Sequence, residues 1–440
     1  MRNLLGHAFA YSAAAVAQKG LGFVLFIWLA AALSVENYAQ FGLFFALQTG
    51  IAALVGAGTI ESVVGQLRHA PDDAERRRVL SAANGVFVLL LGTALLLLVV
   101  LSGWLRRETG ATATEIWLLA AIGALSGFYV LQAQLVRLNE LHLASLVLNN
   151  APMFAAFLGG FVGFLIDGTV RSFFVGMALG LACSLPAFAR LYTGLAHAFA
   201  ERRLVAGIAR RIFPFLVIAI IGWLTGYGST YLINSFFDVA DVSRFTFAFT
   251  ISSVMQLVAT SLNQVWSPRF FRIVHDTPHA EVERQSRRFF VVQGLILGAV
   301  GGGILLLLPA ALELAGDRLQ AYTGLSAALA CLLAGYAVLI PWYHAHNYFL
   351  VHSRGTDLMV LTVTASAAGL VLWFVAIWFL GPLGAYLGFT IQMLARCVAI
   401  VTRARRDWHI LLHWEGPAIA LLLIGLGAVV GELLRGAFFP

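Results

Sequence analysis

The sequence predicts an all-α polytopic membrane protein, because of its composition, the length of its apolar segments and the distribution of its arginines. Of 440 residues, 60% are hydrophobic and only 11% are charged, whereas soluble domains carry about 25% charged residues. The apolar residues fall in separate segments of about 20 residues or more, enough for a helix to cross the bilayer core. Segments such as 86–101 lack the alternation that strands of a membrane barrel require, so helices are expected throughout.

About thirteen membrane-spanning helices are expected from the apolar segments. They cover approximately residues 8–33, 39–66, 79–104, 115–136, 143–166, 172–196, 212–236, 242–267, 289–310, 321–350, 358–380, 383–402 and 416–434. The first segment is longer than the core of a signal peptide and contains Lys19, so we expect it to be retained as a span. The connections are short, and none has the length of a soluble catalytic domain.

The basic residues set the orientation of the chain. With a cytoplasmic N-terminus, most of the 28 Lys and Arg residues lie at cytoplasmic helix ends, above all in 68–78, 190–211 and 269–288. This is the asymmetry that the positive-inside rule requires. Because these charges are scattered over short connections, the net charge of +7 indicates membrane topology and no nucleic-acid partner.

A weak internal repeat divides the chain into halves. Segment 34–41 aligns with 238–245, and the same shift places Arg68 on Arg272 at the exit of the following helix. Repeated groups of spans are typical of transporters that handle their substrate between two bundles. We expect an N-terminal six-helix bundle in residues 1–200, a C-terminal six-helix bundle in 201–405, and an additional transmembrane helix in 406–440.

Three short segments give the chain a family resemblance. The connection after the first span reads LSVENYAQFG at 33–42, the second span contains Gly56-Ala57-Gly58 with Arg68 at its exit, and the twelfth span opens with GPLGAY at 381–386. With these segments, residues 1–405 resemble the polysaccharide or O-antigen flippases of the MOP superfamily. This superfamily also contains the MATE drug antiporters and the lipid II flippase.

The resemblance implies two MATE-like bundles that alternate access. The implied substrate is a polyprenyl-pyrophosphate-linked oligosaccharide, carried from the cytoplasmic to the periplasmic leaflet for lipopolysaccharide O-antigen or exopolysaccharide synthesis. It further implies a multi-pass protein of the bacterial inner membrane, surrounded by lipid, with H⁺ or Na⁺ as the candidate coupling ion. A polysaccharide polymerase and glycosyltransferases are the expected protein partners, and no cofactor is expected.

Lys19, the single lysine, lies near the middle of the predicted first span. A cation there costs about 2.5–3.5 kcal/mol unless it faces water or a partner, which makes it a candidate functional residue. A pyrophosphate is the natural complement of such a cation. The alternative is a structural role, in which Lys19 snorkels or pairs with a carboxylate such as Glu61 of the second span. Glu61 is also a candidate residue for ion coupling.

Arg396 is the second cation within a predicted span, and Gln392 precedes it by one helical turn. Both residues are candidates to line the wall of a substrate cavity in the C-terminal bundle. Alternatively, the side chain of Arg396 extends towards the basic residues 403–406 at the cytoplasmic end. The sequence leaves both interpretations open.

The eighth span carries a polar face, and the second span carries a weaker version of it. The polar residues of the eighth span are Ser252, Ser253, Gln256, Thr260, Asn263, Gln264 and Ser267. The repeat aligns Gln48 with Ser252 and Thr59 with Asn263. We expect these faces to line a water-filled cleft that binds sugar hydroxyls, with Gln48, Gln256, Thr260 and Asn263 as cavity residues. The alternative is interhelical bonding, which contributes about 0.6 kcal/mol per hydrogen bond.

The tenth span contains Pro341, which favours a kink, followed by His344 and His346. Two positions apart on a helix, the histidines point to different sides and make a poor metal pair. His344 is a candidate for proton coupling because histidine titrates near neutral pH; ordinary packing is the alternative. We find no motif for nucleotide binding, nucleophilic catalysis or zinc, so no catalytic residue or metal ligand is expected.

Two other functions are alternatives to that of a flippase. A MATE-like cation-coupled drug or metabolite antiporter shares the architecture but requires a buried carboxylate, whereas the charge expected in mid-membrane is that of Lys19. The sign of this charge favours an anionic substrate. A membrane enzyme such as a glycan polymerase would present a large periplasmic loop. The sequence therefore predicts a transporter.

Overall fold

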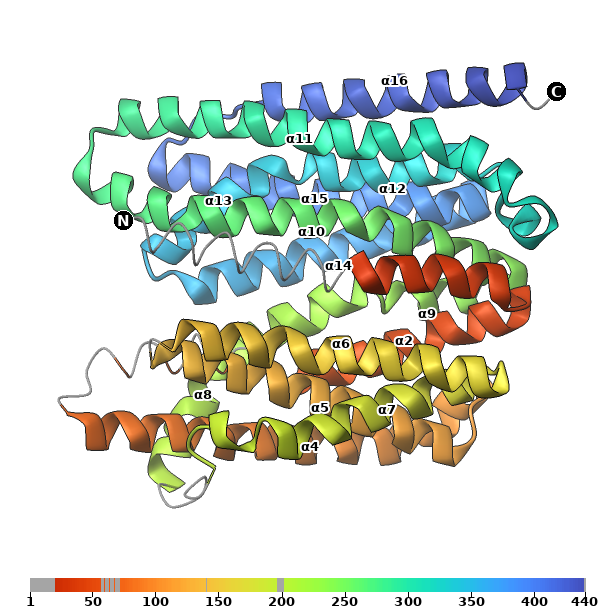
Figure 1. Ribbon diagram of the computed structural model, residues 1–440. Coiled ribbons are helices and arrows are strands. Elements are labelled where there is room, and N and C mark those ends of the chain that lie inside the picture. The colour runs from red at the N-terminus through yellow and green to blue at the C-terminus, as the bar shows by residue number, and fades with distance from the viewer. Residues whose placement is uncertain are drawn as a thin grey trace. The chain divides into compact units, whose positions relative to one another are not determined.

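The protein is helical throughout the part that the computed structural model describes, which comprises residues 20–56, 59, 63, 67, 72–139, 141–195 and 202–438. The helices of this part are Gly20–Ala32, α2 (Val35–Gly56), α4 (Asp73–Thr109), α5 (Ala113–Leu138), α6 (His142–Asp167), α7 (Val170–Ala187), α8 (Arg202–Leu224), α9 (Ser229–Asn234), α10 (Val239–Asp276), α11 (His279–Leu314), α12 (Ser326–Val338), α13 (Ile340–Val351), α14 (Gly355–Leu380), α15 (Pro382–Trp408) and α16 (Glu415–Phe438). Figure 1 shows their arrangement.

Twelve helices of the described part are long and apolar enough to cross a membrane, when α12 and α13 are taken as one. They follow the predicted second to thirteenth spans in order, which confirms a multi-pass membrane protein. The predicted first span overlaps the helix Gly20–Ala32, while its N-terminal part lies outside the described residues. The predictions for Lys19, Glu61 and Arg68 therefore also lie outside them.

The segment 269–288 still connects the eighth and ninth spans, but all of it except Thr277 and Pro278 is helical. Its arginines, glutamates and glutamine are strong helix formers that prolong α10 and α11 beyond the apolar segments. Pro278 has no N–H to donate, so the chain breaks there and α11 begins at His279. Hydrophobicity located the spans correctly, but it could not show where the helices end.

Capping residues set several of the other helix ends. Thr112 and Glu115 form a reciprocal capping box at the start of α5, with the Glu115 carboxylate 2.8 Å from the Thr112 nitrogen. Gly110 ends α4 and Gly168 ends α6, both with a left-handed backbone (φ of 66° and 68°) that glycine adopts without strain.

The chain packs as two compact units. The first comprises the described residues up to Leu25 and Glu36–Phe236, and the second comprises Phe26–Val35 and the described residues from Phe237 onward. The seventh predicted span belongs to the first unit by packing: Trp223 Nε1 of α8 donates to the Ala46 carbonyl at 2.8 Å. The division by packing thus comes later in the chain than the division at residue 200 that the repeat predicts.

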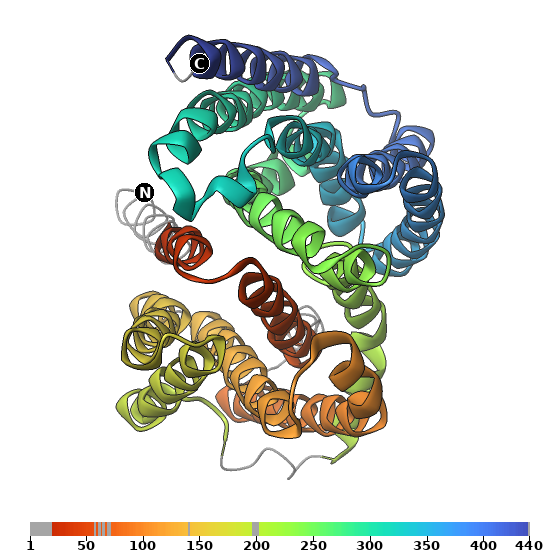
Figure 2. The same ribbon diagram turned by 90° about the vertical axis from the view of Figure 1, so that its right-hand side faces the viewer.

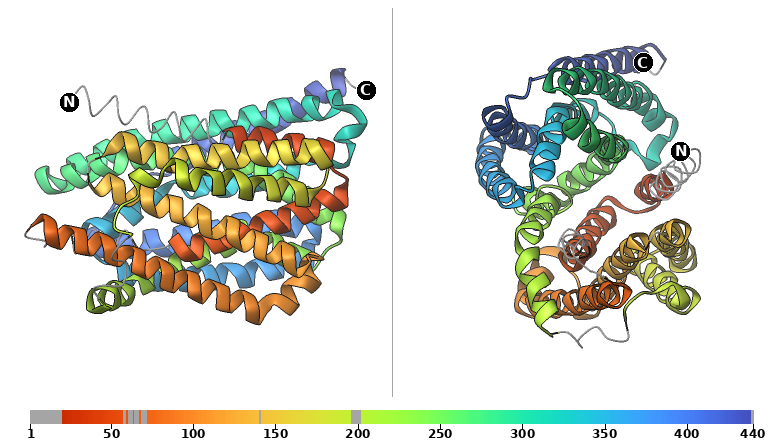
Figure 3. Two further views of the ribbon diagram at one scale, coloured as in Figure 1. Left: turned by 60° about the horizontal axis from the view of Figure 1, so that its bottom comes forward. Right: turned by 90° about the vertical axis from the view of Figure 1, so that its left-hand side faces the viewer.

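Within the first unit, α5, α6 and α7 run side by side (Figure 3). Glycines bring α6 and α7 into backbone contact, since a Cβ on Gly176 would lie 2.0 Å from the Gly159 carbonyl oxygen. Gly123 of α5 meets α2 in the same way, with 2.6 Å from its Cβ position to the Gln48 carbonyl oxygen. Such close packing is typical of membrane helices, where dispersion contacts replace the hydrophobic effect.

Within the second unit, α16 lies along α11 (Figure 2). The two helices meet through glycines: a Cβ on Gly294 would lie 2.2 Å from the Gly416 carbonyl oxygen, and one on Gly427 would lie 2.2 Å from that of Gly302. The helix predicted as an addition to the C-terminal bundle therefore packs within the second unit over much of its length.

The tenth span is broken between α12 and α13, as Pro341 predicts. Leu339 separates the two helices, and Pro341 occupies the first turn of α13, where its missing N–H costs nothing. His344 and Asn347 of α13 are buried against neighbouring helices of the second unit.

Candidate functional site

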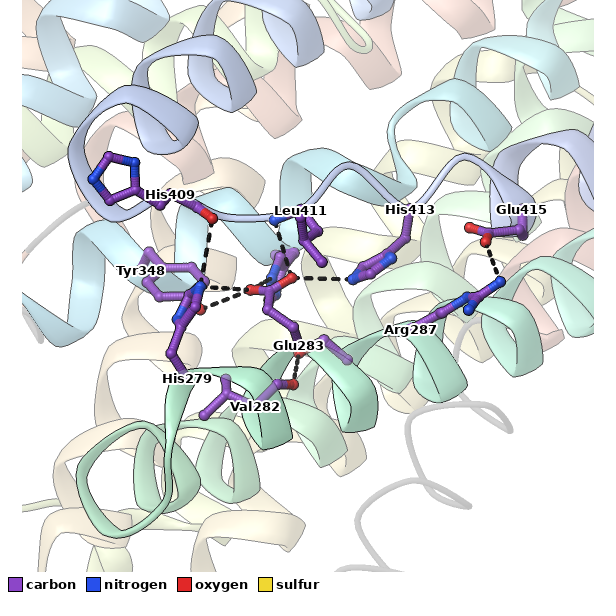
Figure 4. Close-up of polar contacts among 11 residues, drawn as sticks. His279, Val282, Glu283, Arg287, Tyr348, His409, Leu411, His413 and Glu415 are labelled. Carbon is purple, nitrogen blue, oxygen red and sulfur yellow. Dashed lines mark hydrogen bonds and ion pairs between the residues drawn. The ribbon is translucent and has the colours of Figure 1, made fainter.

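Glu283, on the second turn of α11, is a buried carboxylate with a side chain only 4% exposed. It accepts hydrogen bonds from the Leu411 N–H at 3.0 Å and the Tyr348 hydroxyl at 3.1 Å. His413 Nε2 lies 3.1 Å from the same carboxylate (Figure 4). Glu283 thereby joins three parts of the second unit: α11, α13 and the segment between α15 and α16.

Two further histidines approach Glu283. His344 Nε2 lies 3.6 Å from Oε1, slightly beyond hydrogen-bond distance, and the side chain of His344 is 2% exposed. It is enclosed by the rings of Phe270 and Phe290, whose centroids lie 5.2 and 5.1 Å from that of its imidazole. His279 Nε2 lies 4.0 Å from Glu283 and is half-exposed, so it is the member of the cluster that solvent reaches.

The side chains of this acid–histidine cluster are of types that bind and release protons. An uncompensated carboxylate is costly to bury, and an imidazolium beside it would neutralise the charge. With both buried histidines neutral, the cluster would carry one negative charge, so uptake of a single proton makes it neutral. No group of three or more potential ligands suited to a metal ion occurs in the described part of the chain.

His352, in the turn after α13, forms no hydrogen bond or ion pair with Glu283 and stacks on another helix instead. Its ring stacks on Trp408 with centroids 4.9 Å apart. Partial burial, together with the nearby His275 and Arg354, lowers the pKa of His352.

The sequence analysis identified His344 but missed Glu283 and His413. Glu283 stands among charged residues and was assigned to a cytoplasmic connection, where burial was not expected. A usable signal was present in the histidines themselves, because His279, His409 and His413 all lie at predicted cytoplasmic span ends. Their meeting point could not be derived without the packing of α16 on α11.

The polar face of α10 is partly engaged in contacts within the second unit. Asn347 of α13 is fully buried and donates to Asn263 Oδ1 at 3.0 Å, and Ser267 Oγ donates to Asn347 Oδ1 at 3.0 Å. The Thr260 hydroxyl bonds to the Gln256 carbonyl of its own helix at 2.8 Å. Of the three cavity residues predicted on α10, Gln256 alone is exposed.

Arg396 lies in the middle of α15 and is 8% exposed, with its guanidinium Cζ 5.6 Å from the centroid of Trp342. No carboxylate among the described residues forms an ion pair with it, and its Nε lacks a hydrogen-bond partner there. The side chain is buried and lies against α13. A cation over an aromatic face gains about 2 kcal/mol when desolvated, which offsets part of the burial.

Gln392 is fully buried beside Gly369 of α14, where a Cβ would lie 2.9 Å from its Cγ. Neither amide atom has a hydrogen-bond partner among the described residues. The residue that the sequence placed on a cavity wall thus packs between two helices.

The first unit contains a pocket of about 520 Å³ between α2, α5 and α6, and Gln48 lies in its wall. The other polar residues that border the pocket are Thr49, Ser126 and Asn149. Phe45 supplies an aromatic surface. A mostly apolar pocket with a few polar groups is the usual character of a small-molecule site. The structure therefore places one of the predicted cavity residues at an open pocket.

Solved structures of other proteins share this arrangement of helices. The chain is similar to an inward-facing multidrug resistance MATE family transporter of the MOP superfamily, with a TM-score of 0.68, 16% identity, and coverage of 91% of this chain and 97% of that one. It is also similar to the lipid II flippase MurJ in an inward closed conformation, with a TM-score of 0.63, 13% identity and 98% of both chains covered. The chain therefore shares its fold with this MATE transporter and with MurJ.

The sequence itself gives the family. Residues 4–274 match the family described as polysaccharide biosynthesis protein, and the chain belongs to this family. No curated protein sequence matches the chain. Membership confirms the resemblance that the segments 33–42 and 56–58 indicated.

Proposed function

We propose that the protein is a flippase that carries a polyprenyl-pyrophosphate-linked oligosaccharide from the cytoplasmic to the periplasmic leaflet by alternating access. The observation that carries this proposal is membership of the polysaccharide biosynthesis family combined with a fold shared with a lipid II flippase. The transported glycan would serve O-antigen or exopolysaccharide synthesis in the bacterial inner membrane. Glycosyltransferases supply such a substrate, and a polymerase consumes it.

The substrate residues follow from the chemistry of the headgroup. Lys19 and Arg396 are the cations that would complement the pyrophosphate. For sugar hydroxyls, the predicted polar residues are Gln48, which borders a pocket, and Gln256, which is exposed. Asn263 supports Gln256 indirectly, because its bond to Asn347 fixes the polar face of α10.

For the coupling ion, the acid–histidine cluster favours H⁺ over Na⁺. We propose that His344 and Glu283 share the coupling proton, with His413 and Tyr348 as further neighbours and half-exposed His279 as the path to solvent. In proteoliposomes, transport by His344→Gln should lose its dependence on an imposed pH gradient while transport at equal pH persists. The matched control is His409→Gln, which alters a histidine whose side chain makes no contact with Glu283. Retention of gradient dependence by His344→Gln would contradict the assignment.

A MATE-like cation antiporter is the second candidate, favoured by one observation. Glu283 is a buried carboxylate, which such an antiporter requires and which the sequence analysis did not find. Its oxygens are occupied by hydrogen-bond donors from protein groups, however, which leaves little capacity for a cationic drug.

One experiment separates the two functions. In a strain that lacks the native gene, the wild-type protein should restore surface glycan, whereas Lys19→Glu at equal expression should abolish it and cause lipid-linked precursor to accumulate on the cytoplasmic side. Lys19→Arg is the control that keeps the charge. Unimpaired glycan export by Lys19→Glu would remove Lys19 from the mechanism. Energised efflux of a cationic dye, without any effect on glycan, would identify the antiporter.

A further inference from the structure

A pocket of about 450 Å³ lies between the facing ends of α10 and α11 in the second unit, apart from the residues proposed for transport. Val265 on α10 and Val292 on α11 border one part of it, and their side chains are 63% and 51% exposed. One helical turn beyond each valine stands an arginine, Arg269 and Arg288 respectively, which also borders the pocket. The pocket is therefore apolar towards the bilayer core and cationic towards the helix ends.

Aromatic rings form a rigid wall of this α10–α11 pocket. Trp266 and Phe289 stack with their centroids 4.6 Å apart and their planes 8° apart. The Arg269 guanidinium Cζ lies 6.0 Å from the Trp266 ring. Aromatic residues with arginines at this depth are typical of the membrane–water interface.

The two guanidinium groups keep binding capacity for an anion. Arg269 Nη2 donates to Gln285 Oε1 at 3.0 Å, which orients the group without neutralising it. Arg288 makes no hydrogen bond or ion pair with the described residues. Glu281, the carboxylate of the pocket, pairs with Arg284 and accepts from Gln285 at 2.8 Å. The charge that remains available is positive.

We propose that the α10–α11 pocket binds the phosphate headgroup of an anionic phospholipid, with the acyl chains lying against Val265 and Val292. A volume of this size accommodates a phosphoglycerol group, and basic pockets between membrane helices are suited to such headgroups. The orientation predicted from the arginines places this lipid in the cytoplasmic leaflet. The site does not depend on the proposed transport function.

The test measures lipid binding by the purified full-length protein in detergent, by titration with phosphatidylglycerol and with phosphatidylcholine. Wild-type protein should prefer phosphatidylglycerol, and Arg269→Ala with Arg288→Ala should weaken its binding about tenfold or more. The matched control, Arg272→Ala with Arg406→Ala, removes the same charge from exposed positions outside the pocket and should retain wild-type affinity. If the alanine pair does not fold, Arg269→Lys with Arg288→Lys replaces it and should weaken binding through loss of the planar fork.

Three outcomes would overturn the proposal. The first is equal affinity of wild-type protein for the two phospholipids. The second is an equal loss of affinity in the pocket variant and in the control variant, which would indicate attraction by net charge alone. The third is binding of undecaprenyl pyrophosphate that phosphatidylglycerol cannot displace, which would identify the pocket as a substrate site. None of these measurements requires transport, so failure of the flippase proposal would leave the result unaffected.

Discussion

The two helices α2 and α10, which the predicted repeat aligns, use their polar residues differently. In the first unit, Gln48 of α2 lies in the wall of an open pocket. In the second unit, Asn263 of α10 is bonded to Asn347 of α13, and the Thr260 hydroxyl donates to a backbone carbonyl of the preceding turn of α10. The repeat predicted from the sequence aligns the polar residues of these two helices. On α2 of the first unit the polar residues border a pocket, whereas on α10 of the second unit they bond to α13.

The largest expected effect lies in the second unit, at Glu283. Glu283→Ala leaves the Leu411 N–H, the Tyr348 hydroxyl and His413 without their acceptor, and breaking a buried ionic contact costs about 3–5 kcal/mol. Denaturant unfolding of the purified protein in detergent measures the free energy of unfolding. Glu415→Ala is the control: its ion pair with Arg287 is largely exposed and is worth about 0–1 kcal/mol. Equal losses would show that the cluster does not stabilise the unit.

An intermediate effect is expected at the joint between α10 and α13. Asn347→Leu removes the bonds to Asn263 and Ser267, which at about 0.6 kcal/mol each should lower the free energy of unfolding by about 1 kcal/mol. Gln256→Ala, on the same face but exposed, should change it by less than about 0.5 kcal/mol. If Asn347→Leu abolished transport and left stability intact, α10 would resemble α2, and the contrast between the units would disappear.

The smallest effect on stability is expected at Gln48. Gln48→Ala enlarges an existing pocket and should change the free energy of unfolding by no more than about 1 kcal/mol. Its effect should appear in transport, as a raised KM for the lipid-linked oligosaccharide in proteoliposomes. Thr49→Ala serves as the control, because that hydroxyl is already bonded to the Phe45 and Ala46 carbonyls at 2.9 Å. An equal change in KM for both variants would show that Gln48 makes no specific contact.

The fold could be predicted from the sequence because its signal is local. Each span is a long apolar segment that must satisfy its own backbone, and the arginines at span ends fix the direction of crossing. Pro341 marked the break between α12 and α13 for an equally local reason. The ends of α10 and α11 were missed, since helix-forming polar residues continue these helices beyond the hydrocarbon.

The candidate site could be predicted only in part, because it depends on packing. Gln48 and Gln392 look alike in sequence, since each is an uncharged polar residue within a largely apolar segment. Gln48 borders a pocket, whereas Gln392 is closed in beside Gly369. Hydrophobic periodicity separates a lipid-facing side from all others, and it cannot distinguish a cavity from a helix interface. The burial of Glu283 could not be predicted from periodicity at all, since its partners come from separate segments of the chain.

The glycine contacts between α11 and α16 make the last helix indispensable. Truncation of the chain after Trp408 would remove α16 from α11. The backbone at the glycines of α11 that contact α16 would then be exposed to acyl chains. Truncation would also withdraw Leu411 and His413 from Glu283 and leave this buried carboxylate without two of its partners. Fusion tags are therefore best attached after residue 438.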